Sequence, residues 1–511
     1  MTGRFEGIII LCYYAIIGLR LKQILTRTSQ NQKESTMSAK VKLIISDTHI
    51  GAGGARQGNK LEDFISDDVF YQWVHQLLDE SNRTGVEMTL IINGDWIEFL
   101  QTPAVDAFDP TRPYPREAYT DVSAAMALKR LEVVHAGHPR VFQALADFIS
   151  PGPPRRSLVI LFGNHDPELA YPQVQERLRT LLGVHGSRSD VVHIGARSYF
   201  EDGIYVEHGN AYTEEVNRFT DPDHPFDPDA PELIERPPGS YFVTDFFNSV
   251  EWERPWIDGV HPASSLIFYA LAYDPAFALR AIKTFLASAP DLVADMLATG
   301  EAEEGEQSLL AELESADEQA LAQRLADDHA FAAAFSDEVA RALMAKGAMP
   351  SGADGVLATG GVASPGPEVR AQEIAEQYWA MLEKAAARLS VEKNARVILH
   401  GHIHERIEKR LPSGALYLNT GTWIWKANFK DAPEEMWRDL IAHPEKYMNQ
   451  RQLTYARVDI APNGDIVAAR LLLANEPPAP PAPPDPMPPS GLWPRFVLAV
   501  RSAAAWMTGW L

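Results

Sequence analysis

One apolar stretch of this chain ends in polar residues that the interior of a strand does not tolerate. Residues 158–161 (LVIL) are apolar and partly β-branched, as is typical of a strand buried on both faces. The stretch breaks off at Gly163, Asn164, His165 and Asp166. An amide, an imidazole and a carboxylate at the end of a buried strand are typical of a site at the edge of an α/β sheet. The same four residues also suit an ordinary turn, so the rest of the chain decides between the two interpretations.

The same kind of stretch recurs along the chain. Residues 41–46 (VKLIIS), 88–93 (MTLIIN) and 395–399 (ARVIL) are predicted as further buried strands, and 197–207 as a hairpin. Helical periodicity over 124–149 separates two of these strands. Strands that alternate with helices indicate right-handed βαβ units and a largely parallel sheet. The sequence therefore predicts an α/β fold.

Side chains that can bind a metal ion follow nearly every predicted strand. They are Asp47 and His49, Asp95, Asn164 and His165, His208, and His402 and His404. Imidazole, carboxylate and amide groups suit borderline divalent ions, of which Mn²⁺ is the first expectation and Fe, Zn, Co and Ni are alternatives. Seven of these residues, His165 apart, are too many for one open catalytic ion. Two divalent metal ions that share a bridging carboxylate are therefore predicted.

The five motifs together resemble those of a known family. DTH (47–49), GD (94–95), GNHD (163–166), HG (208–209) and GHIH (401–404) resemble the calcineurin-like metallophosphoesterases, over about 37–210 and 390–473. The resemblance implies a four-layer α/β/β/α metallophosphoesterase sandwich, here with a large helical insertion as a cap. GDWIEF after the third strand and the helical insertion look more like the UDP-2,3-diacylglucosamine pyrophosphohydrolase branch than like the protein phosphatases.

The resemblance also implies a role for each motif residue. The first metal would be held by Asp47, His49 and His404, and the second by Asn164, His208 and His402. Asp95 would bridge the two metals. His165 would face the phosphoryl group of the substrate, and Asp166 would position His165. His400 stands at a place that the family does not use as a ligand.

The expected reaction is hydrolysis of a phosphodiester, a pyrophosphate or a phospholipid-like ester by a hydroxide that bridges the two metals. Two other functions stay open. The chain could be a membrane-recruited adaptor that keeps the metal site for structure only, because it carries a large insertion and an amphipathic C-terminus. It could also be a Ser/Thr protein phosphatase, although those enzymes lack a cap of this size and this chain lacks their arginine-bearing GNHE stretch.

Charge and cysteine content restrict the partners and the compartment. The net charge is −23, from 46 basic and 69 acidic residues, and such a field repels nucleic acid. We therefore expect a small phosphorylated or lipid-like substrate and no nucleic-acid binding. Cys12 is the only cysteine, so no intrachain disulfide can form and a cytoplasmic location is expected.

The chain is predicted to divide into two core segments with an insertion and two distinctive ends. The first core segment is 37–210, the mostly helical insertion is 211–390 and the second core segment is 391–474. Residues 1–36 carry an apolar run at 7–19 that is shorter than the roughly 20 residues of a membrane span. Either they are not made, because Met37 is the start, or they form a membrane anchor, or they fold.

The C-terminal end combines a stiff linker with an amphipathic helix. Residues 475–490 are proline-rich, with nine prolines between 477 and 489, which is typical of an extended spacer. In 491–511 the apolar side chains fall on one helical face and Arg495 and Arg501 on the other. Such a helix suits peripheral contact with the inner face of the membrane, or docking onto this protein or a partner.

Membrane contact through 491–511 can be tested on vesicles. Full-length protein should co-sediment with anionic vesicles, because the arginines and tryptophans of this segment suit the lipid interface. A chain that ends at Asn475 should stay in the supernatant. Equal binding by the two proteins would remove the membrane interpretation.

Overall fold

A computed structural model describes residues 40–213, 217–261, 274–288, 318–327, 367–429 and 432–474. The predicted N-terminal stretch, proline-rich linker and C-terminal helix lie outside these residues, as does much of the 211–390 insertion. Within the described ranges, no helix combines the length and the apolarity that crossing a membrane requires.

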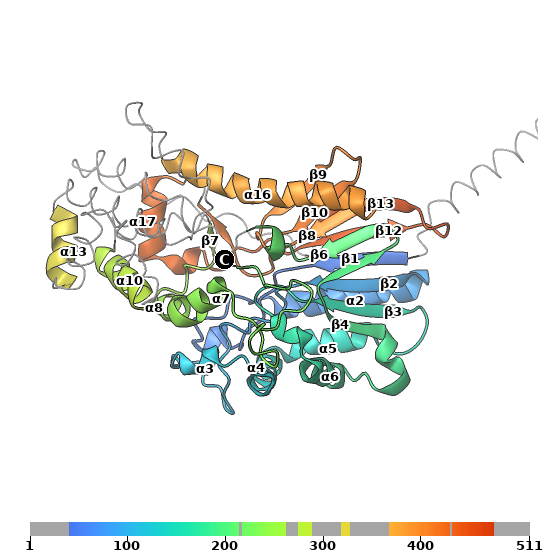
Figure 1. The fold of residues 1–511 in the computed structure, drawn as a ribbon, viewed down its shortest axis with the longest axis horizontal. Helices are drawn as coiled ribbons and strands as arrows, with labels where there is room; N and C mark the ends of the chain where they lie inside the picture. The colour runs from blue at the N-terminus through green and yellow to red at the C-terminus, as the bar shows by residue number, and fades with distance from the viewer. Residues whose placement is uncertain are drawn as a thin grey trace, which may run out of the picture.

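The larger sheet has six strands in the order β13-β12-β1-β2-β3-β4 (Figure 1). Its four parallel strands are β1 (Lys40–Ile45), β2 (Glu87–Asn93), β3 (Arg156–Leu161) and β4 (Val192–Ala196). Its antiparallel edge is the hairpin of β12 (Thr454–Ile460) and β13 (Ile466–Leu473). The predicted strands at 41–46, 88–93 and 158–161 are thus neighbours in one sheet.

The second sheet has five strands in the order β5-β6-β8-β10-β9. They are β5 (Ser198–Glu201), β6 (Ile204–Glu207), β8 (Val397–His400), β9 (Arg406–Arg410) and β10 (Leu416–Thr420), and β6, β8 and β10 run parallel. A separate pair joins β7 (Val260–His261) to β11 (Ala427–Asn428). The prediction of an α/β fold is confirmed, with two mixed sheets.

Apolar side chains cover both faces of the larger sheet, as the predicted burial of its strands requires. Leu43, Leu90 and Ile160 pack with the helices α2 (Asp67–Thr84), α4 (Ala124–Gly137), α5 (Pro139–Phe148) and α6 (Pro172–Leu181). Residues one position away on the strands form a second cluster with the other sheet, which contains Ile44, Ile91, Val159, Val206, Leu399 and Leu418. This alternation follows from the period of two along a strand.

Helix α16 (Pro367–Glu392) lies along the second sheet (Figure 1). Its Leu382, Ala386 and Leu389 form a buried cluster with Ile398 and Tyr417 of β8 and β10. The last part of the predicted insertion therefore packs as part of the second core segment.

The remaining described elements are helices and single turns. The helices are α3 (Glu117–Thr120), α7 (Pro238–Phe242), α8 (Asn248–Glu253), α10 (Pro275–Ser288), α13 (Glu318–Asp327) and α17 (Glu434–Ala442), with a π-helical turn η6 (Val243–Phe247) between α7 and α8. Single 3₁₀ turns are η1 (Ala55–Gln57), η2 (Pro167–Ala170), η3 (Gly186–Val191), η4 (Asn210–Tyr212) and η9 (Pro444–Lys446).

The helix predicted over 124–149 is in fact two helices, α4 and α5, that meet at His138. Pro139 begins the second helix, because a proline ring suits the first helical position and ends the preceding hydrogen-bond ladder. His138 is 2% exposed and lies between two carboxylates, with Nδ1 2.8 Å from Asp67 Oδ1 and Nε2 3.2 Å from Glu62 Oε2. Burial opposes its charge, but these carboxylates outweigh burial and raise the pKa of His138 to about 10.

Replacement of His138 should destabilise the fold in a pH-dependent way. A pKa near 10 in the folded state exceeds the unfolded value of about 6.5, so the charged histidine stabilises the fold fully below pH 6.5 and progressively less towards pH 10. His138→Gln should therefore lower the free energy of unfolding by about 3 kcal/mol at pH 6 and by much less at pH 10. Urea unfolding at the two pH values measures this difference. His75→Gln, which removes a half-exposed pair with Asp147, is the control and should cost roughly 0.5 kcal/mol. A His138→Gln cost that does not fall with pH would contradict the ion-pair explanation.

Candidate metal centre

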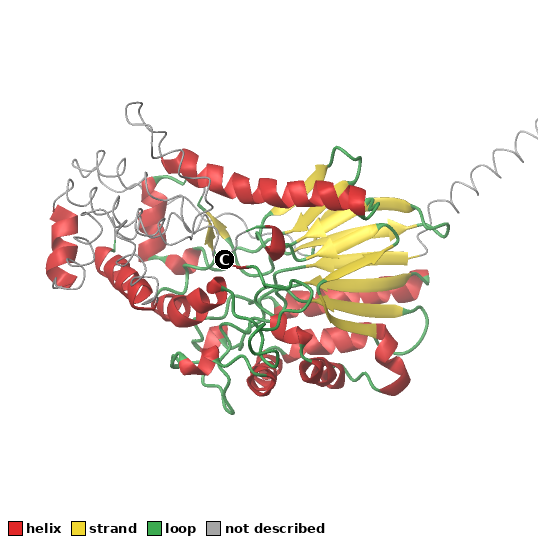
Figure 2. Cartoon of the chain, viewed as in Figure 1, coloured by secondary structure: helices red, strands yellow, loops and turns green. Residues whose placement is uncertain are grey.

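The strand ends that carry the predicted ligands meet where loops gather between the sheets and the helices of the insertion (Figure 2). The loops after β1 and β2 run side by side there. The Asp47 amide donates to the Gly94 carbonyl (3.2 Å), and the His49 amide donates to the Asp95 carbonyl (2.9 Å). Parallel pairing of the two strands thus brings the first two motifs together.

Three of the predicted ligands form a first buried group. Asp47, His49 and His404 each offer a donor atom, and these atoms lie within 4.8 Å of one another. Nε2 of His49 lies 3.1 Å from Nε2 of His404, and Asp47 Oδ1 lies 3.5 Å from the same His404 atom. Two imidazole nitrogens and a carboxylate that face one another in a buried space form a suitable cradle for a divalent cation.

A second group contains Asp95, His208 and His402, whose donor atoms also lie within 4.8 Å of one another. His208 Nε2 lies 3.1 Å from Asp95 Oδ2. Asn164 is buried, and its Oδ1 has no hydrogen-bond partner. A buried amide oxygen without a hydrogen-bond partner is energetically unfavourable, and coordination to a metal ion would remove that cost.

Asp95 lies between the two groups. Its Oδ2 is 3.1 Å from His208 Nε2 and 3.7 Å from His49 Nε2. Its Oδ1 accepts the backbone N–H of His165 (2.9 Å), which fixes the orientation of the carboxylate. This is the position that a bridging ligand would require.

Backbone strain is concentrated at the predicted ligands. Non-glycine residues rarely adopt positive φ, and such residues cluster at functional sites. Five of the seven described non-glycine residues with positive φ are predicted metal ligands: Asp47 (53°), His49 (43°), Asp95 (48°), His402 (71°) and His404 (55°). The surrounding fold therefore holds these side chains in place against a local cost.

Two glycines make room for the carboxylates. A Cβ at Gly163 would lie 2.1 Å from Asp95 Oδ1, and a Cβ at Gly401 would lie 2.5 Å from Asp47 Oδ2. Asp47 Oδ1 accepts the His402 N–H (2.9 Å), whereas Asp47 Oδ2 is buried without a partner. Gly401 thus leaves space for an Asp47 oxygen that is buried without a hydrogen-bond partner.

The carboxylate that contacts the His165 ring is Glu98, so the prediction that Asp166 positions this ring is wrong. Glu98 Oε2 lies 2.7 Å from Nδ1 of both His165 and His49. Burial would raise the pKa of Glu98, but His165 and His49 outweigh it and lower that pKa to about 2. Burial is likewise outweighed at His165, where the charges of Glu98 and Asp95 raise the pKa to about 10.

Asp166 instead organises the loop backbone. Its carboxylate accepts the N–H groups of Gly163 (2.7 Å), Asp95 (3.1 Å), Trp96 (2.8 Å) and Ile97 (3.3 Å). Asp166 therefore joins the GNHD turn to the turn that presents Asp95. Its pKa is raised to about 7 by burial and by the nearby charge of Asp95.

Sequence reasoning missed Glu98. A charged residue inside the apolar stretch WIEF, three positions after Asp95, was the available signal. His400, which the sequence interpretation left out of the ligand set, is fully buried with no hydrogen bond to either ring nitrogen. Burial and the neighbouring His208 lower the pKa of His400 to about 3, so it is a neutral core residue.

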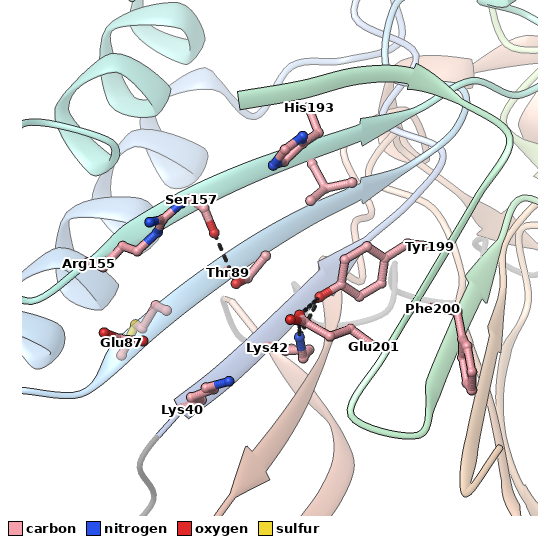
Figure 3. A pocket seen from close by; sticks show the side chains of 12 residues that line it. Lys40, Lys42, Glu87, Thr89, Arg155, Ser157, His193, Tyr199, Phe200 and Glu201 are labelled. Atoms are coloured by element: carbon pink, nitrogen blue, oxygen red, sulfur yellow. Dashed lines mark hydrogen bonds and ion pairs between the residues drawn. The ribbon is translucent and has the colours of Figure 1, made fainter. Parts of the chain in front are cut away.

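A cavity of about 440 Å³ lies at the opposite ends of the strands (Figure 3). It is lined by the amino-terminal halves of β1, β2 and β3 and by β5, and at one wall Lys42 contacts Tyr199 and Glu201. The predicted ligands do not line it, so the candidate centre and this cavity are separate.

Comparisons with other proteins add nothing to this geometry. No family model, curated protein or solved structure matches the chain. The buried His/Asp groups, the strained backbone and the buried oxygens without partners are the features that could hold metal ions.

Replacement of Glu98 should weaken metal binding without removing a ligand. Glu98→Gln removes the charge that orients His49 and His165, and loss of such a supporting carboxylate lowers metal affinity by roughly 10–100-fold. Calorimetric titration with Mn²⁺ measures the change. Glu132→Gln, which breaks a surface pair with Arg177, is the control and should bind like wild type. Wild-type affinity in Glu98→Gln would show that Glu98 does not support the centre.

Proposed function

We propose that the protein is a metal-dependent phosphoesterase of the calcineurin-like type. One observation carries the proposal: side chains from five separate strand ends form three buried ligand groups, and the group of His49, Asp95 and His165 shares His49 with the first group and Asp95 with the second. The overlap matches the pattern expected for a dinuclear site in which one carboxylate serves both ions. The fold proposed with it is a four-layer α/β/β/α sandwich. Apolar clusters between the two sheets and beneath the helices on their outer faces support this arrangement.

The residues present fit two divalent ions, with Mn²⁺ the first candidate. Asp47, His49 and His404 would hold one ion, and Asn164, His208 and His402 the other. Asp95 would lie between them. When bound, such ions supply Lewis-acid stabilisation of phosphoryl oxygens and make a water molecule more acidic.

The chain itself contributes a charged imidazole beside the centre. Glu98 holds Nδ1 of His165 and so leaves Nε2 as the nitrogen that can donate to a substrate. In the metal-free protein, the charges of Glu98 and Asp95 outweigh burial and raise the pKa of His165. An imidazolium in this position would stabilise negative charge on the phosphoryl oxygens or donate a proton to the leaving oxygen.

The proposed substrate is a phosphodiester, a pyrophosphate or a phospholipid-like ester. Segments of the predicted insertion support a role in substrate selection, because they contact the loop that carries Glu98. Asn248 of the α8 helix donates to the Leu100 carbonyl (2.9 Å), and Gln101 donates to Glu251 of the same helix. We also propose a cytoplasmic location, with peripheral membrane contact through 491–511.

Two substitutions test the proposed reaction. Asp95→Asn should abolish Mn²⁺-dependent hydrolysis of bis(p-nitrophenyl) phosphate, because the shared ligand loses its charge. His165→Ala should keep Mn²⁺ binding and lower kcat by roughly 10²–10⁴-fold, with a smaller change in KM. Steady-state assays with calorimetric Mn²⁺ titration separate the two effects.

The matched control is His193→Ala, which removes a histidine that lines the separate cavity. Its activity should equal that of the wild type. Full activity in Asp95→Asn would overturn the proposed site. Absence of Mn²⁺-dependent turnover by wild type on monoester, diester and pyrophosphate substrates would overturn the proposed function.

A further inference from the structure

A second group of acidic side chains lies near the metal centre and has no part in the proposed reaction. Asp63 lies in the loop before α2, Glu251 lies on α8, and Asp258 lies in the turn before β7. One carboxylate oxygen of each lies within 4.8 Å of those of the other two. The three residues are 5%, 0% and 8% exposed, respectively.

Each of these carboxylates keeps a buried oxygen without a hydrogen-bond partner. These atoms are Asp63 Oδ2, Glu251 Oε1 and Asp258 Oδ1. The opposite oxygens of two of them are engaged: Trp425 Nε1 donates to Asp63 Oδ1 (2.7 Å), and Gln101 Nε2 donates to Glu251 Oε2. Those contacts fix the orientation of Asp63 and Glu251, and each of the three carboxylates keeps one buried oxygen without a partner.

The group has no ion-pair partner in the part of the chain that the structure describes. Among the described residues, no lysine, arginine or histidine forms an ion pair with Asp63, Glu251 or Asp258. Burial of several carboxylates without a cation is strongly unfavourable. Without a cation, burial and the neighbouring carboxylates raise the pKa of both Asp63 and Glu251 well above the ordinary value. The group therefore requires either retained protons or a bound cation.

We propose that Asp63, Glu251 and Asp258 bind a hard divalent cation of the Ca²⁺ or Mg²⁺ class, at a site separate from the histidine-rich centre. All the donors are carboxylate oxygens, the ligands that these cations prefer. The two groups of ligands differ in chemistry, because the other centre offers imidazole nitrogens that suit Mn²⁺ or Zn²⁺. The proposal does not depend on the proposed reaction.

The proposed cation would fasten part of the insertion to the core. Asp63 belongs to the first core segment, whereas Glu251 lies on α8 and Asp258 lies in the turn between α8 and β7. Neighbouring contacts already hold the two together: the Ala427 amide donates to the Gly259 carbonyl (2.8 Å), and a Cβ at Gly259 would lie 2.5 Å from the Trp425 ring. Occupancy would stabilise this junction.

The test follows thermal unfolding and calorimetric binding of the full chain after treatment with a chelator. Ca²⁺ is the main probe, because it takes oxygen ligands and the imidazoles of the other centre suit it poorly; Mg²⁺ is titrated in parallel. Saturating Ca²⁺ should raise the unfolding midpoint of the wild type by roughly 5 °C. Glu251→Gln should lower the affinity at least about 10-fold and lose this rise.

Glu251→Gln also separates a cation site from a purely structural cluster. The glutamine keeps an acceptor for Gln101 and removes a buried charge, so in chelator this variant should unfold at the wild-type temperature or above it. Asp258→Asn should show the same loss of the Ca²⁺ response. It replaces Glu251→Gln as the test variant if Glu251→Gln does not fold. Glu253→Gln, which alters an exposed carboxylate on the same helix, should respond to Ca²⁺ like the wild type.

Asp95→Asn distinguishes the two sites, because it should lose Mn²⁺ binding at the histidine-rich centre and keep the Ca²⁺ response. The proposal is overturned if neither Ca²⁺ nor Mg²⁺ binds the wild-type chain. It is also overturned if Glu251→Gln and Asp258→Asn respond to both ions as the wild type does. Neither of these results would contradict the proposed phosphoesterase activity, because that activity is measured in separate assays.

Discussion

The Asp95 carboxylate is the contact on which the rest of the centre depends. Oδ1 accepts the His165 amide, and Oδ2 faces the imidazoles of His208 and His49. The Asp95 backbone, held at φ 48°, is fixed by the carboxylate of Asp166. One residue thus connects the turn after β2 with the turn after β3 and with both ligand groups, so a shift of either turn would separate the groups.

Histidines offset the charge of the carboxylates that are buried in the loops after β1 and β2. Asp47 and Asp95 are buried carboxylates whose negative charge is partly offset by His208 and, at Asp47, by His404; these histidines lower both carboxyl pKa values against the effect of burial. Glu98 repeats the arrangement with His49 and His165. Carboxylates and imidazoles therefore alternate through the centre, and a divalent ion would compete with protons for the same donor atoms.

The sequence predicted the strands correctly where the apolar pattern of one stretch determines its secondary structure. Continuous apolar stretches predict β1, β2, β3 and β8, and parallel pairing then brings their ends together. The strands β4 (VHIGA) and β9 (RIEKR) were missed, because polar and partly exposed residues give them no such pattern. The partner of His165 was misassigned for a different reason. Sequence proximity favours Asp166, whereas the choice depends on how the 94–98 loop folds over the GNHD turn, and that is a tertiary contact.

The segment from Glu98 to Gln101 connects two groups of buried carboxylates that differ in how their negative charge is compensated. At its start Glu98 is charged and satisfied, with an N–H from Leu100 (3.0 Å) on one oxygen and two imidazoles at the other. At its end Gln101 orients Glu251, whose remaining oxygen is buried without a partner. The histidines can compensate the first group even without metal, whereas no described lysine, arginine or histidine forms an ion pair with the second. An external cation would therefore stabilise the second group more, so the junction between core and insertion is where ion binding should most affect the fold.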